Sequence, residues 1–569
     1  MPPVTAGGLT STILSEGAHL TPGGPKGMIL SRKAHPMRNN AEIVVDVLER
    51  TGIRYVFGYP GGQNARFIEA MHGSNVEFVL VTHEACAGFM ADVYGRLTGR
   101  PGACLSTLGP GATNMTTGVG NAFLDRVPLL AFTAQMGKSW HGRTVQMHID
   151  HGKLYAPITK WTTPLETGKV YATMKKALEI ALRERPGPVH LDVPEDMAEE
   201  SSAESPGEFG VTPDKVAPFD SKALEKAMVL IQKAQFPLVA VGLSMNRALA
   251  TGDLREFVEK HRLPVVSTLM AKGQIQEEDA QFVGVLGRAC REIVAEYYKP
   301  VDLIIAIGYD PVEINFEDWV RKGVPLIHID TVRADIDPGY PVPWEVIGDI
   351  REILRALDKM PLLNHEWDLQ ALRSHRQKLH DALTPDQKHF SPHHVLQAMR
   401  QILPSNGMLA VDVGAHTHLI GQLWETRGPG NFLVSNGWSS MGFAIPAAIS
   451  AKLIRPERPV VACVGDGGFL MMVGEISTAV RLKLPVIFVV LRDNVLSLIK
   501  VKQSRRKFQN DGVGIFTSDY RSSDNLFGAK VVTVREEDSF REAFKQGLRG
   551  EGPLVIEAVV DPAEYDQLI

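Results

Sequence analysis

Short apolar runs alternate with amphipathic segments along most of the chain from Asn40 onwards. The runs have the length and the Val, Ile and Leu content of buried strands, and the segments between them repeat apolar residues at helical spacing. Strands that alternate with helices pair in parallel and are covered on both faces, so this pattern predicts an α/β fold. We expect three doubly wound domains, each with a parallel sheet flanked by helices.

The first predicted domain spans residues 38–200. Its first helix is expected to be capped by Asn40 and to stop at Gly52, and a second helix should begin in the segment THEACAG, which contains Glu84. Its strands are expected at Tyr55–Phe57, Val76–Val81, Gly102–Thr107 and Val127–Ala134.

A polar segment rich in Ser, Pro and Gly, residues 201–217, predicts a linker to a second α/β domain over residues 218–360. Residues 361–390 are charged and are expected to connect this domain to a third one over residues 391–569. Residues 1–37 lack a periodic apolar face and predict a flexible tail. The strands of the second domain are expected at Pro237–Val241, Val265–Thr268, Leu303–Ile307 and Leu326–Ile329.

Composition narrows the choice of function. The chain has 60 basic and 65 acidic residues, so its net charge of −5 offers no basic field for nucleic acid. Its four cysteines form no CxxC pair, which is typical of a reducing compartment and not of a disulfide or zinc framework. No apolar run approaches the roughly 20 residues of a membrane span, and no signal-peptide segment is present. We therefore expect a cytoplasmic protein without a membrane partner.

The most informative stretch begins with the apolar run Val460–Val464, which ends in the sequence GDGG at 465–468. An amphipathic segment, Met471–Leu482, follows and predicts a helix. A second apolar run, Val486–Leu491, ends in Asp493. The order strand, Gly turn, helix, strand is typical of a βαβ unit.

This unit places two carboxylates at one edge of a sheet. Asp466 and Asp493 both leave the carboxyl ends of parallel strands, where open α/β sheets bind ligands. The two charges repel unless a cation lies between them, and the amides of a Gly turn can bind phosphate. A Mg²⁺ ion that holds a diphosphate satisfies both requirements. GDG alone is a common turn sequence, and the second strand-ending acid is what makes the signal specific.

The segment from Gly465 to Asp493 resembles the diphosphate and metal motif of thiamine diphosphate (ThDP) enzymes, and GDGGFLMMVGEISTAVRLKLP is similar to their acetolactate synthase branch. The resemblance implies that Asp466, Asp493 and the main-chain oxygen of Val495 ligate Mg²⁺. Many relatives have Asn at the Asp493 position, and Asp there resembles the catabolic, flavin-free acetolactate synthases. Domains one, two and three then correspond to the pyrimidine-binding, central and diphosphate-binding domains.

The resemblance also implies further cofactor contacts in the third domain. Met441 stands where a side chain props ThDP into its bent shape, although Met is also a common core filler. Glu475, in the helix after GDGG, either supports the site or lies on the surface. The implied contacts to the diphosphate are Gly414, His416, Gly465, Gly467 and Gly468.

Glu84 is the candidate catalytic acid. A carboxylate in the first turn of a helix also interacts favourably with the helix dipole and needs no further role. The small-residue helix that follows Glu84, and GPGATN after it, resemble the pyrimidine-binding domain of ThDP enzymes. In that family the matching Glu binds N1′ of the aminopyrimidine and drives the proton transfer that activates C2. The small residues would admit a partner subunit or a flat ring, and His83 is either a substrate contact or a cap.

The substrate side departs from the family in part. Gly109 and Gln135 match family positions near the reacting carbons. Acetolactate synthases then carry Phe-Gln or His-Gln, where an ungapped count gives this chain Gln146-Met147 and a shift by one gives Val145-Gln146, with His148 and His151 just beyond. These two histidines are either surface residues or part of the site. Lys502 stands where catabolic forms have Gln, and it either attracts an anionic substrate or belongs to a solvated basic face.

The central domain carries GVLGRAC and IGYDPVE in place of the flavin-binding segments, and the second resembles the flavin-free type, so we expect no FAD. The resemblance implies ThDP- and Mg²⁺-dependent decarboxylation of a 2-oxo acid, expected to be pyruvate, with ligation of the enamine to a second carbonyl. This is the acetolactate synthase reaction of branched-chain amino acid biosynthesis. It implies a homodimer or homotetramer in which Glu84 of one subunit serves the cofactor of the other.

Two alternatives stay open at this point. Loss of the Phe-Gln pair is consistent with a ThDP-dependent decarboxylase or an acyl transferase with a different acceptor. A catalytically silent ThDP-binding paralogue is the other, although the retention of Glu84, Asp466 and Asp493 argues against it.

Overall fold

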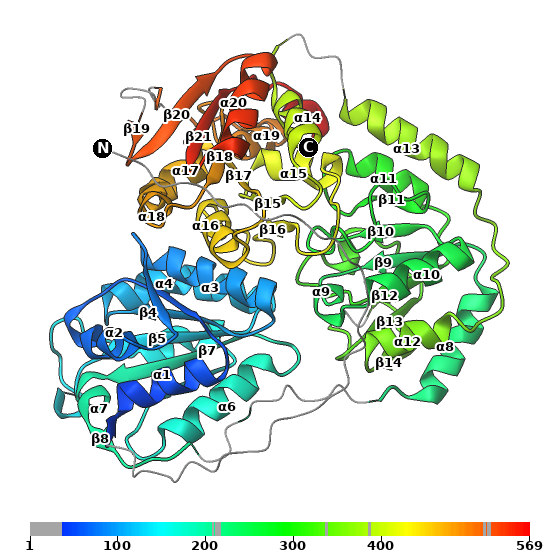
Figure 1. Cartoon of the computed structure of the whole chain (residues 1–569). Helices are drawn as coiled ribbons and strands as arrows, with labels where there is room; N and C mark the ends of the chain where they lie inside the picture. Colours follow the sequence, from blue (N-terminus) through cyan, green and yellow to red (C-terminus); the bar gives the residue numbers. More distant parts are fainter. Residues whose placement is uncertain are drawn as a thin grey trace, which may run out of the picture.

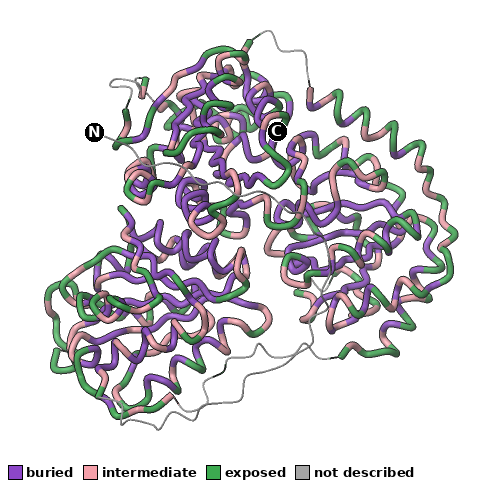
Figure 2. Tube along the Cα trace, viewed as in Figure 1, coloured by how far each residue is buried: buried purple, intermediate pink, exposed green. Residues whose placement is uncertain are grey.

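The computed structural model describes residues 37–140, 142–206, 210, 218–335, 339–384, 389–515, 519–520 and 525–569. It contains three α/β domains, each built on a sheet with helices on both faces (Figure 1). The strands of all three sheets are largely buried (Figure 2). The predicted fold class is therefore confirmed. The predicted tail, apart from Met37, and most of the predicted linker lie outside the described residues.

The N-terminal domain has a six-stranded sheet in the order β3-β2-β4-β5-β7-β6, with all neighbours parallel. Its strands are β2 Tyr55–Gly58, β3 Glu77–Leu80, β4 Gly102–Ser106, β5 Leu129–Gln135, β6 Trp161–Pro164 and β7 Pro188–Pro194. Its helices are α1 Asn40–Arg50, α2 Ala65–Met71, α3 Glu84–Thr98, α4 Pro110–Leu124, α5 His151–Tyr155, α6 Val170–Leu182 and α7 Glu195–Glu199. A short antiparallel pair, β1 Arg38–Asn39 with β8 Ser201–Ser202, ties its two ends together.

The first helix begins one residue earlier than a cap at Asn40 predicts. Asn39, and not Asn40, is the N-cap, because its side chain accepts a hydrogen bond from the Glu42 amide while Glu42 accepts one from the Asn39 amide. The side chain of Asn40 instead donates to Met197 O and Thr167 Oγ1. The predicted cap at Asn40 is wrong because two adjacent asparagines are equivalent in sequence and only tertiary contacts separate their roles.

The central domain has a six-stranded parallel sheet in the order β11-β10-β9-β12-β13-β14. Its strands are β9 Pro237–Val241, β10 Val265–Ser267, β11 Phe282–Val285, β12 Leu303–Ile307, β13 Leu326–Asp330 and β14 Trp344–Ile347. Its helices are α8 Ser221–Lys233, α9 Met245–Ala248, α10 Thr251–His261, α11 Arg291–Tyr297 and α12 Ile350–Leu357. The charged segment after it contains a regular helix, α13 Leu369–Leu383, whose buried leucines pack on this domain.

The C-terminal domain has a seven-stranded sheet in the order β16-β15-β17-β18-β21-β20-β19, parallel except for the β19–β20 edge. Its strands are β15 Met408–Val411, β16 Phe432–Val434, β17 Val460–Gly465, β18 Val486–Arg492, β19 Asn525–Leu526, β20 Ala529–Val534 and β21 Leu554–Val559. Its helices are α14 Pro392–Ile402, α15 Ala415–Leu423, α16 Ala444–Ile454, α17 Asp466–Met472, α18 Ile476–Arg481, α19 Ser497–Arg505, α20 Glu537–Arg549 and α21 Glu564–Leu568.

The helix predicted over Met471–Leu482 is wrong in its extent. Helix α17 already begins at Asp466, a 3₁₀ turn (Val473–Glu475) interrupts the path, and α18 continues it to Arg481. The interruption contains Gly474, and it turns Glu475 into the interface with the N-terminal domain.

The N- and C-terminal domains share one hydrophobic core within the chain. In Figure 1, α3 and α4 of the N-terminal domain lie next to α16 of the C-terminal domain. Helix α3 packs on α4 so closely that a Cβ at Gly88 would lie 2.6 Å from Gly118 Cα. The other side of α3 packs on α16, where Ser450 Oγ donates to Met90 O at 2.8 Å. The small residues of α3 are thus used for close helix contacts inside the subunit. Among the described residues, no helix is both long and apolar enough to cross a membrane.

Candidate active site

A cavity of about 180 Å³ opens at the carboxyl edge of the C-terminal sheet. It is formed by the segments that follow β15, β17 and β18, together with the turn that precedes α16. All nine cofactor and metal residues predicted in this domain line it: Gly414, His416, Met441, Gly465, Asp466, Gly467, Gly468, Asp493 and Val495. The predicted substrate residue Lys502 does not line it.

Asp466 and Asp493 bring two carboxylates to this cavity. Burial and the neighbouring charge of Asp493 raise the pKa of Asp466 to about 6, and burial raises the pKa of Asp493. Backbone amides hold both: Asp466 accepts from Asn494 N at 2.6 Å, and Asp493 accepts from Val495 N at 3.0 Å. Burial thus disfavours the ionised form of both groups, the charge of Asp493 adds to this for Asp466, and a bound cation would offset both effects.

The main-chain oxygen of Val495 is held by the same turn. It accepts a hydrogen bond from Ser497 N at 2.8 Å, and a carbonyl oxygen has a second lone pair for a metal ion. Asn494 between Asp493 and Val495 has a φ of 60°, a left-handed conformation that Asn tolerates. The turn therefore offers two carboxylates and one carbonyl, the hard oxygen donors that Mg²⁺ prefers.

The other side of the cavity suits a diphosphate. His416 Nε2 is buried and has no hydrogen-bond partner among the described residues, and burial lowers the pKa of His416 to about 4. Its neutral ring can therefore donate to an anion that enters the cavity. The amides at the start of α15 point to the same place. Gly468 is required for close packing, because a Cβ there would lie 2.7 Å from Asp412 Oδ1. The residues present fit Mg²⁺ and a diphosphate together.

Asp412 is a site residue that sequence reasoning missed. It follows β15 and is fully buried, and its carboxylate accepts from Gly442 N at 2.9 Å and from Ala444 N at 3.0 Å. It thereby fixes the turn that carries Met441, whose Cε lies 3.0 Å from where a Cβ on Gly467 would be. Asp412 ends a strand as Asp466 and Asp493 do, and that position is the signal that could have found it.

Glu84 lies in the N-terminal domain and is not among the residues that line this cavity. It opens α3, is 8% exposed, and accepts a hydrogen bond from Asn114 Nδ2 at 3.0 Å. His83 caps the helix, since its Nδ1 accepts from Ala85 N at 3.1 Å, which supports the capping interpretation. Gly111 keeps space open beside Glu84, because a Cβ there would lie 3.2 Å from Glu84 Oε1.

A buried polar network surrounds Gln135 at the end of β5. Gln135 Nε2 donates to Ile149 O at 3.2 Å and to Asp192 Oδ2 at 3.3 Å, while its Oε1 accepts from Met136 N at 2.9 Å and pairs with His148 Nδ1 at 2.8 Å. The carboxamide is thus fixed by partners on both ends, and its orientation does not depend on a ligand.

His151 joins this network to the Gly109 loop. Its Nδ1 lies 2.9 Å from Asp192 Oδ1, and its Nε2 accepts from Gly109 N at 3.2 Å. These partners require the proton on Nδ1. Although burial opposes ionisation, hydrogen bonds from His151 and Thr133 keep the pKa of Asp192 below its ordinary value. His151 is fully buried, so its interpretation as a surface residue is wrong.

Comparison with known proteins identifies the three domains. Residues 38–154 match the N-terminal TPP-binding domain of thiamine pyrophosphate enzymes, residues 224–357 match the central domain, and residues 412–558 match the C-terminal TPP-binding domain. Acetolactate synthase of Bacillus subtilis is 30% identical over 539 residues, which are 93% of this chain and 94% of the relative. The chain belongs to the acetolactate synthase-like family of thiamine diphosphate enzymes.

Two further relatives support this family assignment. The large subunit of acetolactate synthase isozyme 2 from Escherichia coli is 30% identical over 92% of this chain and 96% of its own length. The catabolic acetolactate synthase of Raoultella terrigena is 28% identical over 92% of this chain and 95% of its own length. The expected family, enzyme class and thiamine diphosphate cofactor are confirmed.

The loop after β5 differs from the family pattern. Gln146 is exposed, while Met147 has a φ of 63° and lies against Gly109, where a Cβ would meet Met147 O at 2.6 Å. Gln146, expected at the family's aromatic or histidine position, therefore lies outside the cluster, and the backbone of Met147 packs against Gly109. A positive φ in a non-glycine residue is unusual and is often found at functional sites.

Two residues with open interpretations occupy different environments. Glu475 is fully buried, and its carboxylate accepts from Thr82 N at 3.0 Å and Thr82 Oγ1 at 2.6 Å, so it is not a surface residue. It connects the diphosphate loop of one domain to the turn before Glu84 in the other. Lys502 is exposed on α19.

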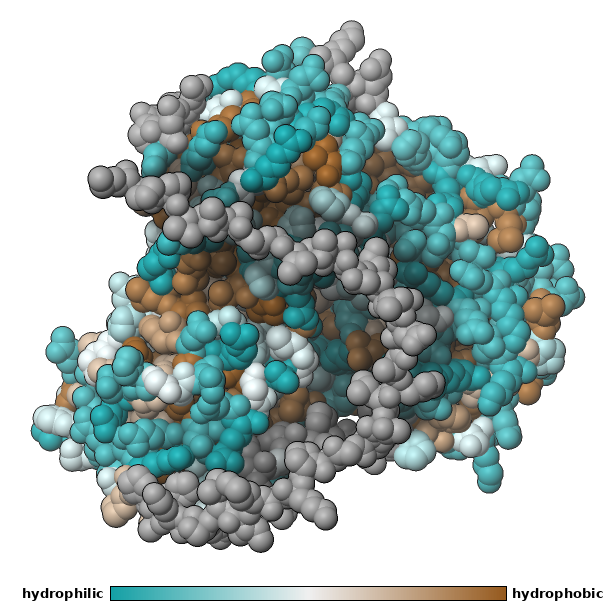
Figure 3. Space-filling view, in the orientation of Figure 1, coloured by the Kyte–Doolittle hydropathy of each residue, from teal (hydrophilic) through white to brown (hydrophobic). Residues whose placement is uncertain are grey.

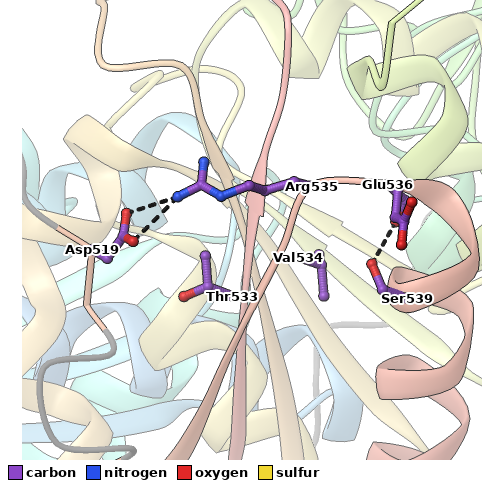
Figure 4. Close-up of a pocket in the computed structure, with 6 residues that line it drawn as sticks. All are labelled: Asp519, Thr533, Val534, Arg535, Glu536 and Ser539. Carbon is purple, nitrogen blue, oxygen red and sulfur yellow. Dashed lines mark hydrogen bonds and ion pairs between the residues drawn. The ribbon is translucent and has the colours of Figure 1, made fainter.

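A different pocket, in the C-terminal domain, carries none of the predicted residues (Figure 4). Its charged groups pair with one another: Arg535 Nη2 lies 3.2 Å from both carboxylate oxygens of Asp519. Ser539 Oγ donates to Glu536 O at 2.9 Å. With its polar groups already paired, this pocket is a weaker candidate than the cavity beside Asp466.

Proposed function

We propose that the protein catalyses the ThDP- and Mg²⁺-dependent decarboxylation of a 2-oxo acid, with pyruvate as the expected substrate, and joins the product to a second carbonyl. The observation that carries this proposal is one cavity that holds two mutually repelling carboxylates beside the unpartnered Nε2 of His416. The first half of that site calls for a cation and the second for an anion, and a metal-bound diphosphate supplies both.

When bound, ThDP supplies the electron sink for decarboxylation, and the protein supplies binding and orientation. Asp466, Asp493 and Val495 O would hold the Mg²⁺ ion, and His416 Nε2 with the glycine amides would hold the diphosphate. Met441 would support the bend of the cofactor from its place against Gly467. Each of these groups is fixed by hydrogen bonds or packing before the cofactor arrives, which is what precise orientation needs.

Glu84 would hold and release the proton that activates the cofactor. Its carboxylate is buried in the first turn of α3 and is oriented by Asn114, and the space kept by Gly111 leaves Oε1 accessible to a ring nitrogen. Gln135 and Gly109 would border the substrate, held by the His151–Asp192 pair.

Since Glu84 does not line the diphosphate cavity of its own chain, we infer a homodimer, or a homotetramer of two such dimers, in which Glu84 serves the cofactor of the other subunit. Apolar side chains are exposed where the N- and C-terminal domains meet (Figure 3). Leu470 and Met471, directly after the diphosphate turn, are 42% and 60% exposed, and Trp438 beside Met441 is 37% exposed. Such apolar exposure next to a site is typical of an interface.

These observations constrain the acceptor substrate less than they constrain the cofactor. If the acceptor is a second pyruvate, the product is 2-acetolactate, and the relatives are named for that product. The altered loop at Gln146 and Met147 favours, as a second candidate, a decarboxylase or transferase of the same family with another acceptor. We retain the prediction that FAD is not required and that the protein is cytoplasmic; its four cysteines are free and buried.

Incubation of the purified protein with pyruvate, ThDP and Mg²⁺ tests the proposal. Acetolactate as the product supports it, and acetaldehyde supports the second candidate. Release of CO₂ from no member of a panel of 2-oxo acids, while ThDP and Mg²⁺ still raise the melting temperature, would identify a silent ThDP-binding paralogue. A colourless holoenzyme that is active without added flavin supports the prediction about FAD.

A further inference from the structure

A second cavity, of about 340 Å³, lies at the carboxyl edge of the central sheet. Its walls come from the segments that follow β10, β11 and β12 and from the C-terminal turn that holds Asn436 and Ser439. Ser439 lines both this cavity and the diphosphate cavity, so the two adjoin. Ser439 has a φ of 50°, an unusual conformation at the point where they meet.

Arg288 is the cation that lines this second cavity, which we name the Arg288 cavity. Its Nη2 donates to Asn436 Oδ1 at 2.6 Å, while its Nε is buried and has no hydrogen-bond partner among the described residues. Its methylene chain lies on Gly421 of α15, where a Cβ would approach Arg288 Cγ to 2.8 Å. The glycine thus makes room for the arginine, which is a sign of a built position.

Two other buried arginines of the chain are paired with acids. Arg96 contacts Asp92 and Asp125 at 2.5 and 2.7 Å, and Arg492 contacts Glu557 at 2.6 Å. In the part of the chain that the structure describes, Arg288 has no such ion pair. A guanidinium removed from water without a counter-charge is costly, so an unpaired one beside a cavity indicates a charge that arrives from outside.

The charges around the Arg288 cavity leave it positive at neutral pH. Burial lowers the pKa of Arg288 to about 10, which keeps it protonated at pH 7. Burial raises the pKa of Glu313, the nearest acid in the lining, to about 8, and its two oxygens accept from Leu243 N at 2.8 Å and Met270 N at 3.1 Å. Asp318 at the rim is exposed to solvent.

Further positive charge lies on the side of the diphosphate cavity. Burial first, and then the charges of Arg288, Lys502 and Arg291, lower the pKa of His418 to about 3. Lys502 of α19 and Arg291 of α11 therefore act on the same region as Arg288. The sequence left open whether Lys502 attracts an anion or belongs to a solvated basic face, and this position favours the first interpretation. The field of these cations would guide an anion towards Arg288.

We propose that the Arg288 cavity is a second anion site, separate from the diphosphate cradle, which takes a carboxylate or phosphate group on the free edge of the Arg288 guanidinium. Two sources share this chemistry: the carboxylate of a 2-oxo acid on its way to the cofactor, and free inorganic phosphate. Only the first of these rests on the proposed function.

The test is a calorimetric titration of the holoenzyme, saturated with ThDP and Mg²⁺ so that the diphosphate cradle is filled. The probes are inorganic phosphate and L-lactate, which carries a carboxylate but no carbonyl to react. We expect saturable binding of at least one probe, weakened about tenfold or more in Arg288→Gln. Arg373→Gln is the matched control: it removes the same charge at an exposed residue of α13 that does not line the cavity.

Binding of lactate alone assigns the cavity to a substrate carboxylate, and binding of phosphate alone assigns it to the free ion. Binding of neither probe to the wild type, or equal binding to Arg288→Gln, overturns the proposal. If Arg288→Gln does not fold, Arg288→Lys decides, because lysine keeps the charge but not the planar fork. Weakened binding at an unchanged melting temperature then supports the site, and unweakened binding rejects it.

Kinetics separate this inference from the proposed function. If a 2-oxo acid uses the cavity, Arg288→Gln should raise its KM about tenfold and change kcat by less than about threefold. A protein inactive on every 2-oxo acid would refute the proposed function and leave the titration result standing.

Discussion

Two polar clusters lie at sheet edges, one in the N-terminal domain and one in the C-terminal domain. They differ in whether their charges are neutralised within the protein. The ligand atoms of His151, His190 and Asp192 all lie within 4.8 Å of one another, close enough to hold a metal ion. Yet the Thr133 hydroxyl lies 3.1, 2.7 and 2.5 Å from these atoms. Among the described residues of the C-terminal cluster, the carboxylates of Asp466 and Asp493 have no cationic side chain between them, and their repulsion contributes to the raised pKa of Asp466.

This comparison shows that proximity of ligand atoms does not by itself define a metal site. In the N-terminal cluster each charge already has a partner, and burial lowers the pKa of His190 to about 4, so the ring is neutral. In the C-terminal cluster the carboxylate pKa values are raised, and Nε2 of His416 has no hydrogen-bond partner within the described part of the chain. We therefore interpret the first cluster as a preformed support for the proposed substrate residues. We interpret the second as a site whose charges are balanced only when ions bind.

The largest effect is expected from Glu84→Gln. If the N-terminal edge contributes chemistry but does not hold the metal, turnover of pyruvate should fall by about 10² to 10⁴. ThDP with Mg²⁺ should still raise the melting temperature, as measured by thermal unfolding. Glu77→Gln, which changes an exposed carboxylate at the start of β3, is the matched control and should keep full turnover. Full activity of Glu84→Gln would exclude Glu84 as the acid.

Asp466→Asn should have two opposite consequences. Without one metal ligand, turnover should fall more than about 100-fold and Mg²⁺ with ThDP should no longer raise the melting temperature. The apo protein, however, should melt at a higher temperature than the wild type, because the variant removes one of two repelling charges. Asp511→Asn, at an exposed position, should change neither quantity. An apo variant less stable than the wild type would contradict the charge argument.

His151→Ala tests the prebuilt cluster. The change removes one of the partners of Asp192 and the side-chain partner of the Gly109 amide, so the free energy of unfolding, measured with urea, should fall by about 1 to 3 kcal/mol. Chelators should not change the stability of the wild-type apo protein, because no metal is needed at this edge. His72→Ala, at an exposed position, provides the control. A rise in apo stability on addition of Zn²⁺ that persists in Asp466→Asn and is lost in His151→Ala would show that the N-terminal cluster does bind metal.

The stability of the apo protein should depend on pH through Asp466 at the C-terminal sheet edge. Because the folded-state pKa of Asp466 is raised from 3.8 to about 6, the folded apo protein binds more protons than the unfolded chain between these values. Its contribution to stability should therefore decrease as pH rises from about 4 to 6, by up to about 3 kcal/mol. The stability advantage of apo Asp466→Asn over the wild type, measured by urea unfolding, should grow across this window. A constant difference would mean that the pKa is not shifted.

The smallest effect is expected from Lys502→Gln. This residue is exposed, so its charge is screened, and the KM for the 2-oxo acid should rise by only about two- to threefold at low salt. The difference should disappear at high ionic strength while kcat stays unchanged. A tenfold change that persists in high salt would indicate direct contact with the substrate.

The sequence by itself determined the C-terminal half of the site. Strand, Gly turn, helix start and second strand follow one another between Val460 and Asp493, so local periodicity places both acids at one sheet edge. Helix bounds within that stretch were less predictable, because the break at Glu475 depends on a contact with Thr82 in another domain.

Only the tertiary structure decided the N-terminal half and the Arg288 cavity. Gln135 on β5, His151 on α5 and Asp192 on β7 come from separate segments, and each has an ordinary alternative role when seen alone. In the sequence, Arg288 looks like any other loop arginine. In the structure it has no acidic partner among the described residues, and Gly421 makes room for its side chain. Sequence periodicity reports contacts between neighbours along the chain, whereas the partner that satisfies or fails to satisfy a buried charge is chosen by packing between distant segments.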